Sequence, residues 1–327
     1  MTSKPSLPTL DDVAALAGVS KAVASRALSG KNRPISADKK QRVLDAAETL
    51  GYVANPFAQS LSNKSTGLIA IVVNHIADIS DLTLFDSLIQ AIQALGKQTL
   101  FIRLRSQQDI AEIKRNPFVH RVDAALIFSD LIEPDEAPNL FYTNQVIMLN
   151  GRKDEQGLSV TINESLGIEQ AIAEAQRKQI RQAILLCGRE TSQVELQRVE
   201  SYRQAMHQHG ITLVQLGYCD YAYETALDYL QSHPIPQTDG LGVFCTSDSM
   251  AMAAMDFFRT TSPAMIERQA IFGFDNTPFS QLGSYRFSTI GYCKDEFVSA
   301  IVRLLTEDNL TTAPQKHRIV ATRFYAR

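Results

Sequence analysis

The sequence predicts an α/β protein with a small all-helical domain at its N-terminus. In the first 54 residues, apolar residues recur at helical spacing and helix-capping residues flank them. From residue 68 onward, short apolar runs alternate with amphipathic stretches, which is typical of parallel sheets in α/β proteins. A chain of 327 residues with 45% hydrophobic and 20% charged residues is long enough for about two or three domains.

The charge is divided unevenly between these two parts. Residues 1–64 carry nine Lys and Arg against five Asp and Glu, a net charge of +4. The rest of the chain carries 23 basic and 30 acidic residues, a net charge of −7. We therefore expect the N-terminal part alone to meet a polyanion.

The first predicted helix follows Thr9 and ends at Gly18. Thr9 and Asp12 have the spacing of a capping box, in which each side chain bonds the backbone N–H of the other residue. The apolar residues at helical spacing are Leu10, Val13, Ala14, Leu16 and Ala17. Gly18 can take the positive φ that ends a helix, and Ser20 suits the start of the next. The pattern indicates a helix-turn-helix, although any short corner between two helices would give it too.

The second predicted helix, within GVSKAVASRALSG (18–30), carries little side-chain bulk on its polar face. Its apolar side comes from Val23, Ala24, Ala27 and Leu28. Its other side carries Lys21, Ala22, Ser25 and Arg26. Small side chains would let this helix enter the major groove of DNA, where Lys and Arg donate to guanine. Ser20 and the helix N-terminus would bind a phosphate. The alternative is an ordinary solvated basic face.

A third helix and a short fourth one are predicted before residue 67. Ser36 is expected to cap the third helix and Gly51 to end it. Its apolar stripe consists of Val43, Leu44, Ala47 and Leu50. Asn55 and Pro56 then suit the start of a two-turn helix. One face of that helix would carry Phe57, Ala58 and Leu61. So short a helix is unstable alone, so it would form only against its twin in a dimer or against DNA, unless the segment is a linker.

The segments TLDDVAALAGVSKAVASRALSG (9–30) and ISADKKQRVLDAAETLGYVANPFAQSL (35–61) together resemble one family. They resemble the DNA-binding head of the lactose-repressor/galactose-repressor (LacI/GalR) family of bacterial transcription regulators, and the likeness covers residues 9–67. The usual Thr, Val and Val of the second helix are replaced here by Val23, Ala24 and Ala27. The resemblance implies a head at 1–54, a hinge helix and linker at 55–67, and a core at 68–327.

The resemblance also implies DNA contacts for eight residues of the head and hinge. Lys21 and Ala22 would choose bases in the major groove, and Arg26 would be the shared base-contacting arginine. The residues touching the DNA backbone would be Ser20, Ser25 and Asn55. Leu61, with Ala58 packed beside it, would wedge between base steps in the minor groove and bend the DNA.

The body of the chain predicts parallel sheets in one large sheet or two lobes. The expected strands lie at 68–73, 99–104, 124–128, 145–149, 182–187, 212–216, 241–245 and 270–274, with helices such as 81–96 and 248–259 between them. The resemblance implies two lobes like those of periplasmic binding proteins. The first would take about 68–160 and 289–316, and the second about 161–288 and 317–327.

Ligands of such sheets bind beyond the carboxyl ends of the strands. The polar residues placed there by the sequence are Asn74, Arg105, Ser129, Asn150, Arg198, Ser247, Asp248 and Asp275. Arg, Asp and side-chain amides suit a ligand with many hydroxyl groups. Flat apolar walls would come from Tyr221, Phe274 and Tyr292. These residues predict an effector site for a small, sugar-like molecule.

The resemblance to the family is patchier in this core. RQAIFGFDNTPFS (268–280) puts Asp275 in place of the ligand-contacting aspartate, and Arg198 takes the place of the effector-binding arginine. Ser247 replaces an Asn of the family pattern. The family's Asp-Asn-x-x-Gly reads NESLG (163–167) here, and its Gly-His-Arg-Arg turn reads RKQIRQ (177–182). We therefore expect an altered effector pocket.

Features of other protein classes are sparse in this sequence. It has no Gly-x-Gly-x-x-Gly, Walker A or Gly-x-Ser-x-Gly motif, so we expect neither an enzyme nor a cofactor. His207 and His209 are two residues apart on a predicted helix, so they are expected to be solvated and to hold no metal. The four cysteines are widely spaced, which favours buried reduced thiols. The N-terminus lacks the apolar stretch of a signal peptide and no run would span a membrane, which predicts a cytoplasmic protein.

These observations favour a sequence-specific DNA-binding transcriptional regulator, a repressor controlled by a small effector. It would bind a pseudo-palindromic, double-stranded operator as a homodimer. Tetrameric members of the family add a C-terminal leucine heptad, whereas this chain ends in the strand-like HRIVATRFYAR. A corepressor-dependent regulator or an activator stays open. A soluble sugar-binding protein would predict a signal peptide and no basic head, and an enzyme with a DNA module would predict a catalytic constellation.

Overall fold

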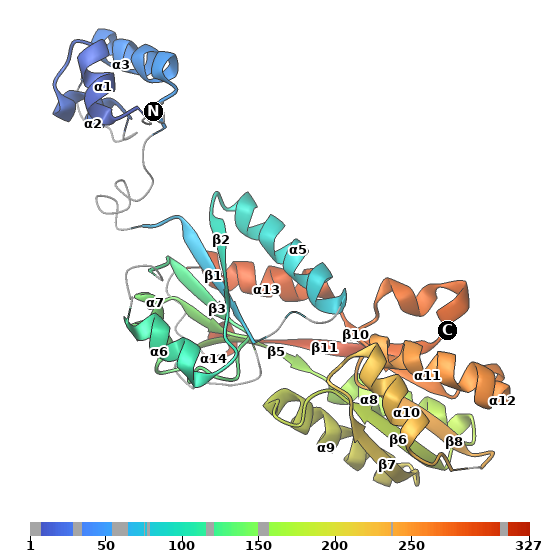
Figure 1. Cartoon of the computed structure of the whole chain (residues 1–327). Helices are drawn as coiled ribbons and strands as arrows, with labels where there is room; N and C mark the ends of the chain where they lie inside the picture. The colour runs from blue at the N-terminus through green and yellow to red at the C-terminus, as the bar shows by residue number, and fades with distance from the viewer. Residues whose placement is uncertain are drawn as a thin grey trace. The chain divides into compact units, whose positions relative to one another are not determined.

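The computed structural model describes residues 8–28, 35–53, 65–74, 76, 79–115, 121–149, 157–236, 238–307 and 313–327. The chain divides into two compact units, Met1–Gly67 and Leu68–Arg327, which we call the head and the core. Figure 1 shows the elements of each unit. No helix in the described ranges is long and apolar enough to cross a membrane.

The head contains three helices within the described residues, and the start of the first follows the predicted capping box. The helices are α1 (Leu10–Leu16), α2 (Lys21–Leu28) and α3 (Ala37–Leu50). The Thr9 backbone N–H donates to Asp12 Oδ2 (2.7 Å), and the Asp12 N–H donates to Thr9 Oγ1 (3.3 Å). Gly18 after α1 and Gly51 after α3 both have φ of +62°, the left-handed backbone that ends a helix.

Small side chains fill the core of the head. The buried apolar residues are Val13, Ala14, Ala17, Ala24, Ala27, Val43, Ala46 and Ala47. Leu16 and Leu44, which were predicted to be part of the apolar stripes, are 55% and 40% exposed. Each side chain points about 100° around its helix from that of a buried neighbour, so it lies outside the buried face of the helix. Ser36 occupies the cap position of α3, but its side chain makes no capping hydrogen bond.

The core consists of one continuous sheet that serves two lobes (Figure 1). Its strand order is β2-β1-β3-β4-β5-β11-β10-β9-β8-β6-β7. The strands are β1 (Leu68–Val73), β2 (Gln98–Arg103), β3 (Ala124–Ile127), β4 (Val146–Met148), β5 (Leu158–Asn163), β6 (Gln182–Cys187), β7 (Thr212–Tyr218), β8 (Leu241–Cys245), β9 (Ile271–Phe274), β10 (Ser288–Tyr292) and β11 (His317–Tyr325). Among the described pairs, β10 and β11 run antiparallel and the others run parallel. The α/β class predicted from the sequence is confirmed.

Helices cover the sheet in both lobes. They are α5 (Ile79–Ala94), α6 (Gln107–Arg115), α7 (Ala137–Phe141), α8 (Ser165–Arg177), α9 (Gln193–Gln208), α10 (Tyr223–Ser232), α11 (Asp248–Thr261), α12 (Pro263–Glu267), α13 (Lys294–Thr306) and α14 (Ala313–Lys316). Two 3₁₀ turns lie at Pro278–Gln281 and Gly283–Tyr285. One apolar cluster fills the second lobe, and two clusters lie in the first lobe.

β11 joins the two lobes, and here the structure differs from the predicted division of the chain. Its first half, 317–321, pairs with β5 of the first lobe, whereas 322–325 pair with β10 of the second. β10 also pairs with β9, so the chain returns to the first lobe after β10, where α13 packs on α5. β5 and β10 were not predicted as strands, because LSVTIN and STIGY place polar residues and glycine at strand positions.

Two expectations about single side chains are wrong. Cys187, Cys219 and Cys245 are buried as predicted, and burial raises the pKa of the Cys219 thiol to about 12, but Cys293 is exposed just before α13. His207 is exposed, whereas the ring of His209 contacts Glu169 Oε1 (2.5 Å) and Gln176 Oε1 (3.2 Å).

Candidate DNA interface and ligand cavity

The exposed face of α2 carries the four residues that the sequence placed there. Lys21, Ala22, Ser25 and Arg26 are all exposed. Ala24 and Ala27 are buried against the other helices of the head. The Ser20 carbonyl accepts the first helical hydrogen bond from the Ala24 N–H (3.0 Å), so Ser20 stands at the cap position. This surface therefore offers two cations, two small side chains and a helix N-terminus.

Both cations of this face are held by weak local contacts. Lys21 Nζ lies 2.7 Å from Asp11 Oδ2, and both side chains are largely exposed. Arg26 Nε donates to the Ala22 carbonyl one turn earlier (3.1 Å). Exposed ion pairs of this kind contribute little stability, so both side chains can exchange these contacts for others at small cost. Asn55, Ala58 and Leu61 lie outside the described residues.

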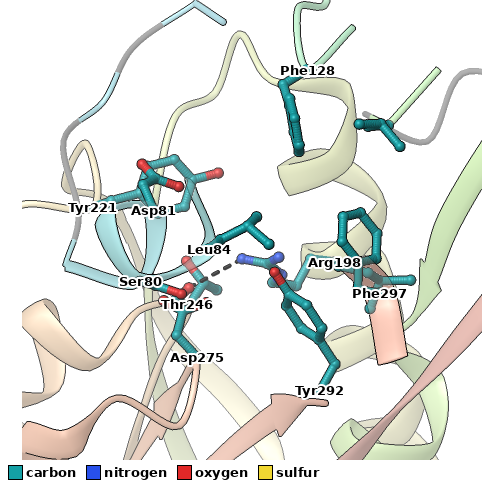
Figure 2. Close-up of a pocket in the computed structure, with 12 residues that line it drawn as sticks. Ser80, Asp81, Leu84, Phe128, Arg198, Tyr221, Thr246, Asp275, Tyr292 and Phe297 are labelled. Atoms are coloured by element: carbon teal, nitrogen blue, oxygen red, sulfur yellow. Dashed lines mark hydrogen bonds between the residues drawn. The ribbon is translucent and has the colours of Figure 1, made fainter. Parts of the chain in front are cut away.

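A cavity of about 210 Å³ lies between the two lobes (Figure 2). Its lining from the first lobe is Ser80, Asp81, Leu84, Phe128, Leu149, Ile162 and Phe297. Its lining from the second lobe is Arg198, Tyr221, Thr246, Asp275 and Tyr292. The structure therefore brings four of the predicted effector residues to one cavity: Arg198, Tyr221, Asp275 and Tyr292.

Arg198 is fixed by an ion-pair network beside this cavity. It lies on α9, not directly after a strand as predicted. Its Nε and Nη2 donate to the two carboxylate oxygens of Glu164 (2.7 and 2.6 Å), and its Nη1 donates to the Thr246 carbonyl (3.1 Å). Nη1 also lies 3.3 Å from Glu195 Oε2, and the guanidinium carbon lies 4.1 Å from the Phe274 ring centroid. Burial by itself lowers the pKa of Arg198, but the Glu164 carboxylate raises it well above its ordinary value.

Tyr221 forms a wall of the cavity through a local backbone arrangement. Asp220 and Tyr221 both have positive φ, of 54° and 59°. The ring lies against Gly188, where an added Cβ would overlap it. The Tyr221 hydroxyl donates to Glu195 Oε2 (2.9 Å), and Glu195 also accepts from the Gly188 N–H (2.6 Å). Burial raises the pKa of Tyr221, so the hydroxyl stays protonated.

Asp275 and Tyr292 reach the cavity from neighbouring strands of the second lobe. Asp275 follows β9 with φ of 104°, and its N–H donates to the Ile290 carbonyl of β10 (2.6 Å). Tyr292 ends β10, and Figure 2 shows its side chain and Asp275 on the same side of the cavity. Burial, followed by the charges of Asp275 and Asp81, raises the pKa of Tyr292. Phe274, predicted as a further wall, is buried beneath Arg198.

Ser247 and Asp248 do not line the cavity but hold the loops that do. Ser247 Oγ caps α11 by accepting from the Met250 N–H (3.3 Å), and it donates to the Tyr221 carbonyl (3.3 Å). The buried carboxylate of Asp248 accepts from the Thr277 N–H (2.6 Å), from the Thr277 hydroxyl (2.7 Å) and from the Thr289 hydroxyl (2.6 Å). These bonds tie α11 to the segment that follows Asp275.

The remaining predicted effector residues that the structure describes do not line this cavity. Ser129 Oγ donates to Asn74 Oδ1, so the two polar side chains satisfy each other. Arg105 is exposed, and its backbone N–H donates to the carboxylate of Asp109. Asn150 lies outside the described residues.

Sequence reasoning missed Glu164, Glu195 and Asp81. Glu164 follows β5 directly, so it stands at a strand end, but that strand was not predicted. The departure of NESLG from the family pattern was the available signal at this position. Glu195 is fully buried one turn before Arg198 on α9, which no local pattern indicates.

A helix-turn-helix head on a two-lobed core with a cavity between the lobes defines a ligand-responsive DNA-binding protein. Residues 9–55 match the family model of bacterial regulatory proteins of the lacI family, and residues 174–327 match the periplasmic binding protein-like domain. The chain therefore carries a DNA-binding domain of the lacI type and a periplasmic binding protein-like domain.

Similar proteins cover nearly the whole chain. The HTH-type transcriptional regulator AscG of Escherichia coli K12 is 27% identical over 309 residues, which is 90% of each protein. The complex of the transcriptional regulator CelR with cellobiose has a TM-score of 0.68 at 23% identity and covers 98% of this chain and 99% of that one. The lac repressor dimer bound to operator and the anti-inducer ONPF has a TM-score of 0.75 at 20% identity, with 98% of each chain covered.

Proposed function

We propose that this regulator is a homodimeric repressor of a pseudo-palindromic operator, controlled by a small hydroxylated ligand in the cavity between the lobes. The ligand belongs to the sugar class. The proposal rests on the presence of two features in the same chain. One is the exposed basic face of α2, and the other is a cavity with walls from both lobes.

The face of α2 is suited to the major groove. Ala22 and Ser25 add little bulk, so the helix backbone can lie close to base edges. Lys21 and Arg26 supply charged donors, and a guanidinium can bond guanine O6 and N7 together. The rest of the chain has a net negative charge, which DNA repels, so the head is the part of the chain suited to bind it. The head therefore has the parts that base-specific binding requires.

A dimer is expected because the α2 face of one head can contact only a short stretch of DNA. One α2 helix reads only a few base pairs, whereas two heads related by a twofold axis read two half-sites one helical turn apart. The solved lac repressor complex, similar in fold, is a dimer on its operator. Two heads on one DNA molecule also combine their phosphate contacts. When the spacing of the heads no longer matches that of the half-sites, the second head cannot bind, and most of the affinity for DNA is lost.

The cavity supplies the link between ligand and DNA. A ligand that touches Asp81 on one side and Asp275 on the other favours one arrangement of the two lobes over others. β1 of the first lobe begins at Leu68, directly after the head unit. A shift of the first lobe in each protomer would therefore change the spacing of two heads, and with it the population that can hold both half-sites.

The test measures DNA binding first and ligand control second. The full chain is used to select binding sites from random double-stranded DNA, and the expected product is a pseudo-palindrome. Binding to that site is then followed by fluorescence anisotropy while sugars are added, and the expected result is a shift in affinity. Failure to enrich any DNA sequence would contradict the proposal. A sugar that tightens DNA binding would show that the ligand is a corepressor and not an inducer.

A further inference from the structure

We infer that Arg327 is a positioning residue of the proposed effector site, and that it holds the turn at Asp275 and Asn276 so that Asp275 lines the cavity. Arg327 lies two positions after β11, and it is not among the residues that line the cavity. The inference rests on the proposed function, because it names a residue that prepares the same site for its ligand without touching that ligand.

The turn that follows β9 has a backbone that needs support from its surroundings. Asp275 and Asn276 have φ of 104° and 50°, a region that residues with a side chain rarely adopt. Two such residues in succession persist only where neighbouring groups hold them. Because Asp275 lines the cavity, the groups that hold this turn also fix the position of a carboxylate offered to a ligand.

β10 supports the backbone of the turn. The Asp275 N–H donates to the Ile290 carbonyl (2.6 Å), and the Asn276 N–H donates to the Thr289 hydroxyl (3.3 Å). The turn packs directly on this strand, since a Cβ added at Gly291 would lie 2.4 Å from the Asn276 Cβ. These hydrogen bonds act on the backbone, and the amide group of Asn276 has a different partner.

The guanidinium of Arg327 binds the turn at two points. Its Nη2 donates to Asn276 Oδ1, and its Nη1 donates to Ser280 Oγ (2.9 Å). Ser280 is fully buried and donates in turn to the Thr277 carbonyl (2.7 Å). The planar fork of a guanidinium sets the distance between its two acceptors, so Arg327 holds both ends of the segment 276–280.

Arg327 is itself anchored to the sheet. Its backbone N–H donates to Ser288 Oγ (3.1 Å), and Ser288 is the buried first residue of β10. Arg327 also follows β11, which pairs with the first lobe along 317–321 and with the second lobe along 322–325. Arg327 therefore connects the turn at Asp275 to the strand that both lobes share.

Asp248 holds the same segment through its carboxylate. It accepts from the N–H (2.6 Å) and the hydroxyl (2.7 Å) of Thr277. Burial lowers the pKa of Arg327, and the charge of Asp248 opposes this shift, so the two charged groups interact. Asp248 is buried, whereas Arg327 is partly exposed. We therefore expect Arg327 to tolerate substitution without loss of the fold.

The first measurement needs no ligand. In Arg327→Gln the guanidinium fork is lost, so the amide N–H groups of residues 275–280 should exchange with deuterium about tenfold or more faster than in the unchanged chain. Arg323→Gln is the matched control, because Arg323 is exposed on β11 four positions earlier. Exchange in β6 and β8 should stay the same in both variants, which shows that both are folded.

The second measurement tests whether Arg327 acts through Asp275. Calorimetry gives the affinities of glucose, galactose and mannose for four full-length forms: the unchanged chain, Arg327→Gln, Asp275→Asn and the double variant. Arg327→Gln alone should weaken a sugar that binds the unchanged chain by about tenfold, because the carboxylate is misplaced. In the Asp275→Asn background it should add less than about twofold, whereas a merely structural role would cost the same affinity in both backgrounds.

Two results would overturn the inference. One is exchange of 275–280 that is unchanged in folded Arg327→Gln, or that rises equally throughout the second lobe. The other is a loss of sugar affinity that is the same with and without Asp275→Asn. Neither result touches the proposed function, which is tested separately by the selection of a DNA site. If none of the three sugars binds, the sugar class in the proposed function loses support, and the exchange measurement alone decides the role of Arg327.

Discussion

Arg26 donates from Nε to the Ala22 carbonyl, and its side chain is exposed on the face of α2 proposed to enter DNA. Glu164 and Gly188 act in a different way, because each fixes a neighbour that faces the cavity. Glu164 holds Arg198, and Gly188 leaves room for the ring of Tyr221. At the scale of single residues, the two proposed sites therefore differ in rigidity. The DNA face carries loosely held cations, and the cavity carries side chains locked by burial and hydrogen bonds.

Removing the guanidinium of Arg26 tests base reading. Arg26→Ala should weaken binding to the selected DNA site by about 1–3 kcal/mol and relax selectivity at one base pair in each half-site. The measurement is the affinity for the selected site and for single-base variants of it. Equal weakening on every sequence would instead show that Arg26 contacts only phosphate.

Adding one methyl group at Gly188 tests the wall formed by Tyr221. In Gly188→Ala the new Cβ overlaps the ring, so the ring must move and ligand affinity should fall about tenfold, in line with overpacking costs of about 1–3 kcal/mol. Binding to DNA without ligand should not change. Gly283→Ala is the control, since nothing lies within 4 Å of its added Cβ. Unchanged ligand affinity in Gly188→Ala would show that the ring is not part of the site.

At the scale of elements, α11 and β11 organise the core. α11 begins at Asp248, whose carboxylate binds the loop after β9 and the start of β10. β11 pairs with one lobe along its first half and with the other along its second. None of the residues that line the cavity lies on α11 or β11, so these two elements act on it only through the segments that they hold.

Deleting the carboxylate of Asp248 tests this role of α11. Asp248→Ala leaves two hydroxyl donors and one N–H donor in buried surroundings, and each buried unsatisfied group costs about 1–3 kcal/mol. The urea midpoint of unfolding should therefore fall clearly, and ligand affinity should fall with it because Asp275 loses its support. Asp228→Ala on the exposed face of α10 should leave both unchanged. A normal urea midpoint in Asp248→Ala would contradict this reading.

At the scale of the whole molecule, we expect two chains to assemble into a homodimer. A homodimer presents two α2 helices to one pseudo-palindromic site, and the C-terminal β11 is built into the sheet, where it pairs with two other strands. Sedimentation equilibrium at micromolar protein should give about twice the chain mass of 36.2 kDa. A mass that stays at one or at four chains would refute the dimer.

Local patterns determined the head and most of the strands. The capping box at Thr9, the glycine at Gly18 and the small apolar side of α2 depend on residues within four positions of one another. The eight predicted strands all match observed ones, because a buried parallel strand reads as a short apolar run. The basic charge of the head was visible from the distribution of Lys, Arg, Asp and Glu along the chain.

Only the tertiary structure decided which polar groups share the cavity. Glu164 and Arg198 are 34 positions apart, and they meet because the end of β5 lies beside α9. Asp248 and Asp275 were both predicted to follow strands and to bind the effector, yet Asp248 is buried among threonines and Asp275 lines the cavity. β5 and β10 escaped prediction because their polar residues are satisfied by distant partners, as Ser159 is by the ring of His317. Spacing along a chain fixes local backbone and buried faces, whereas the charge of a site depends on which distant segments the fold brings together.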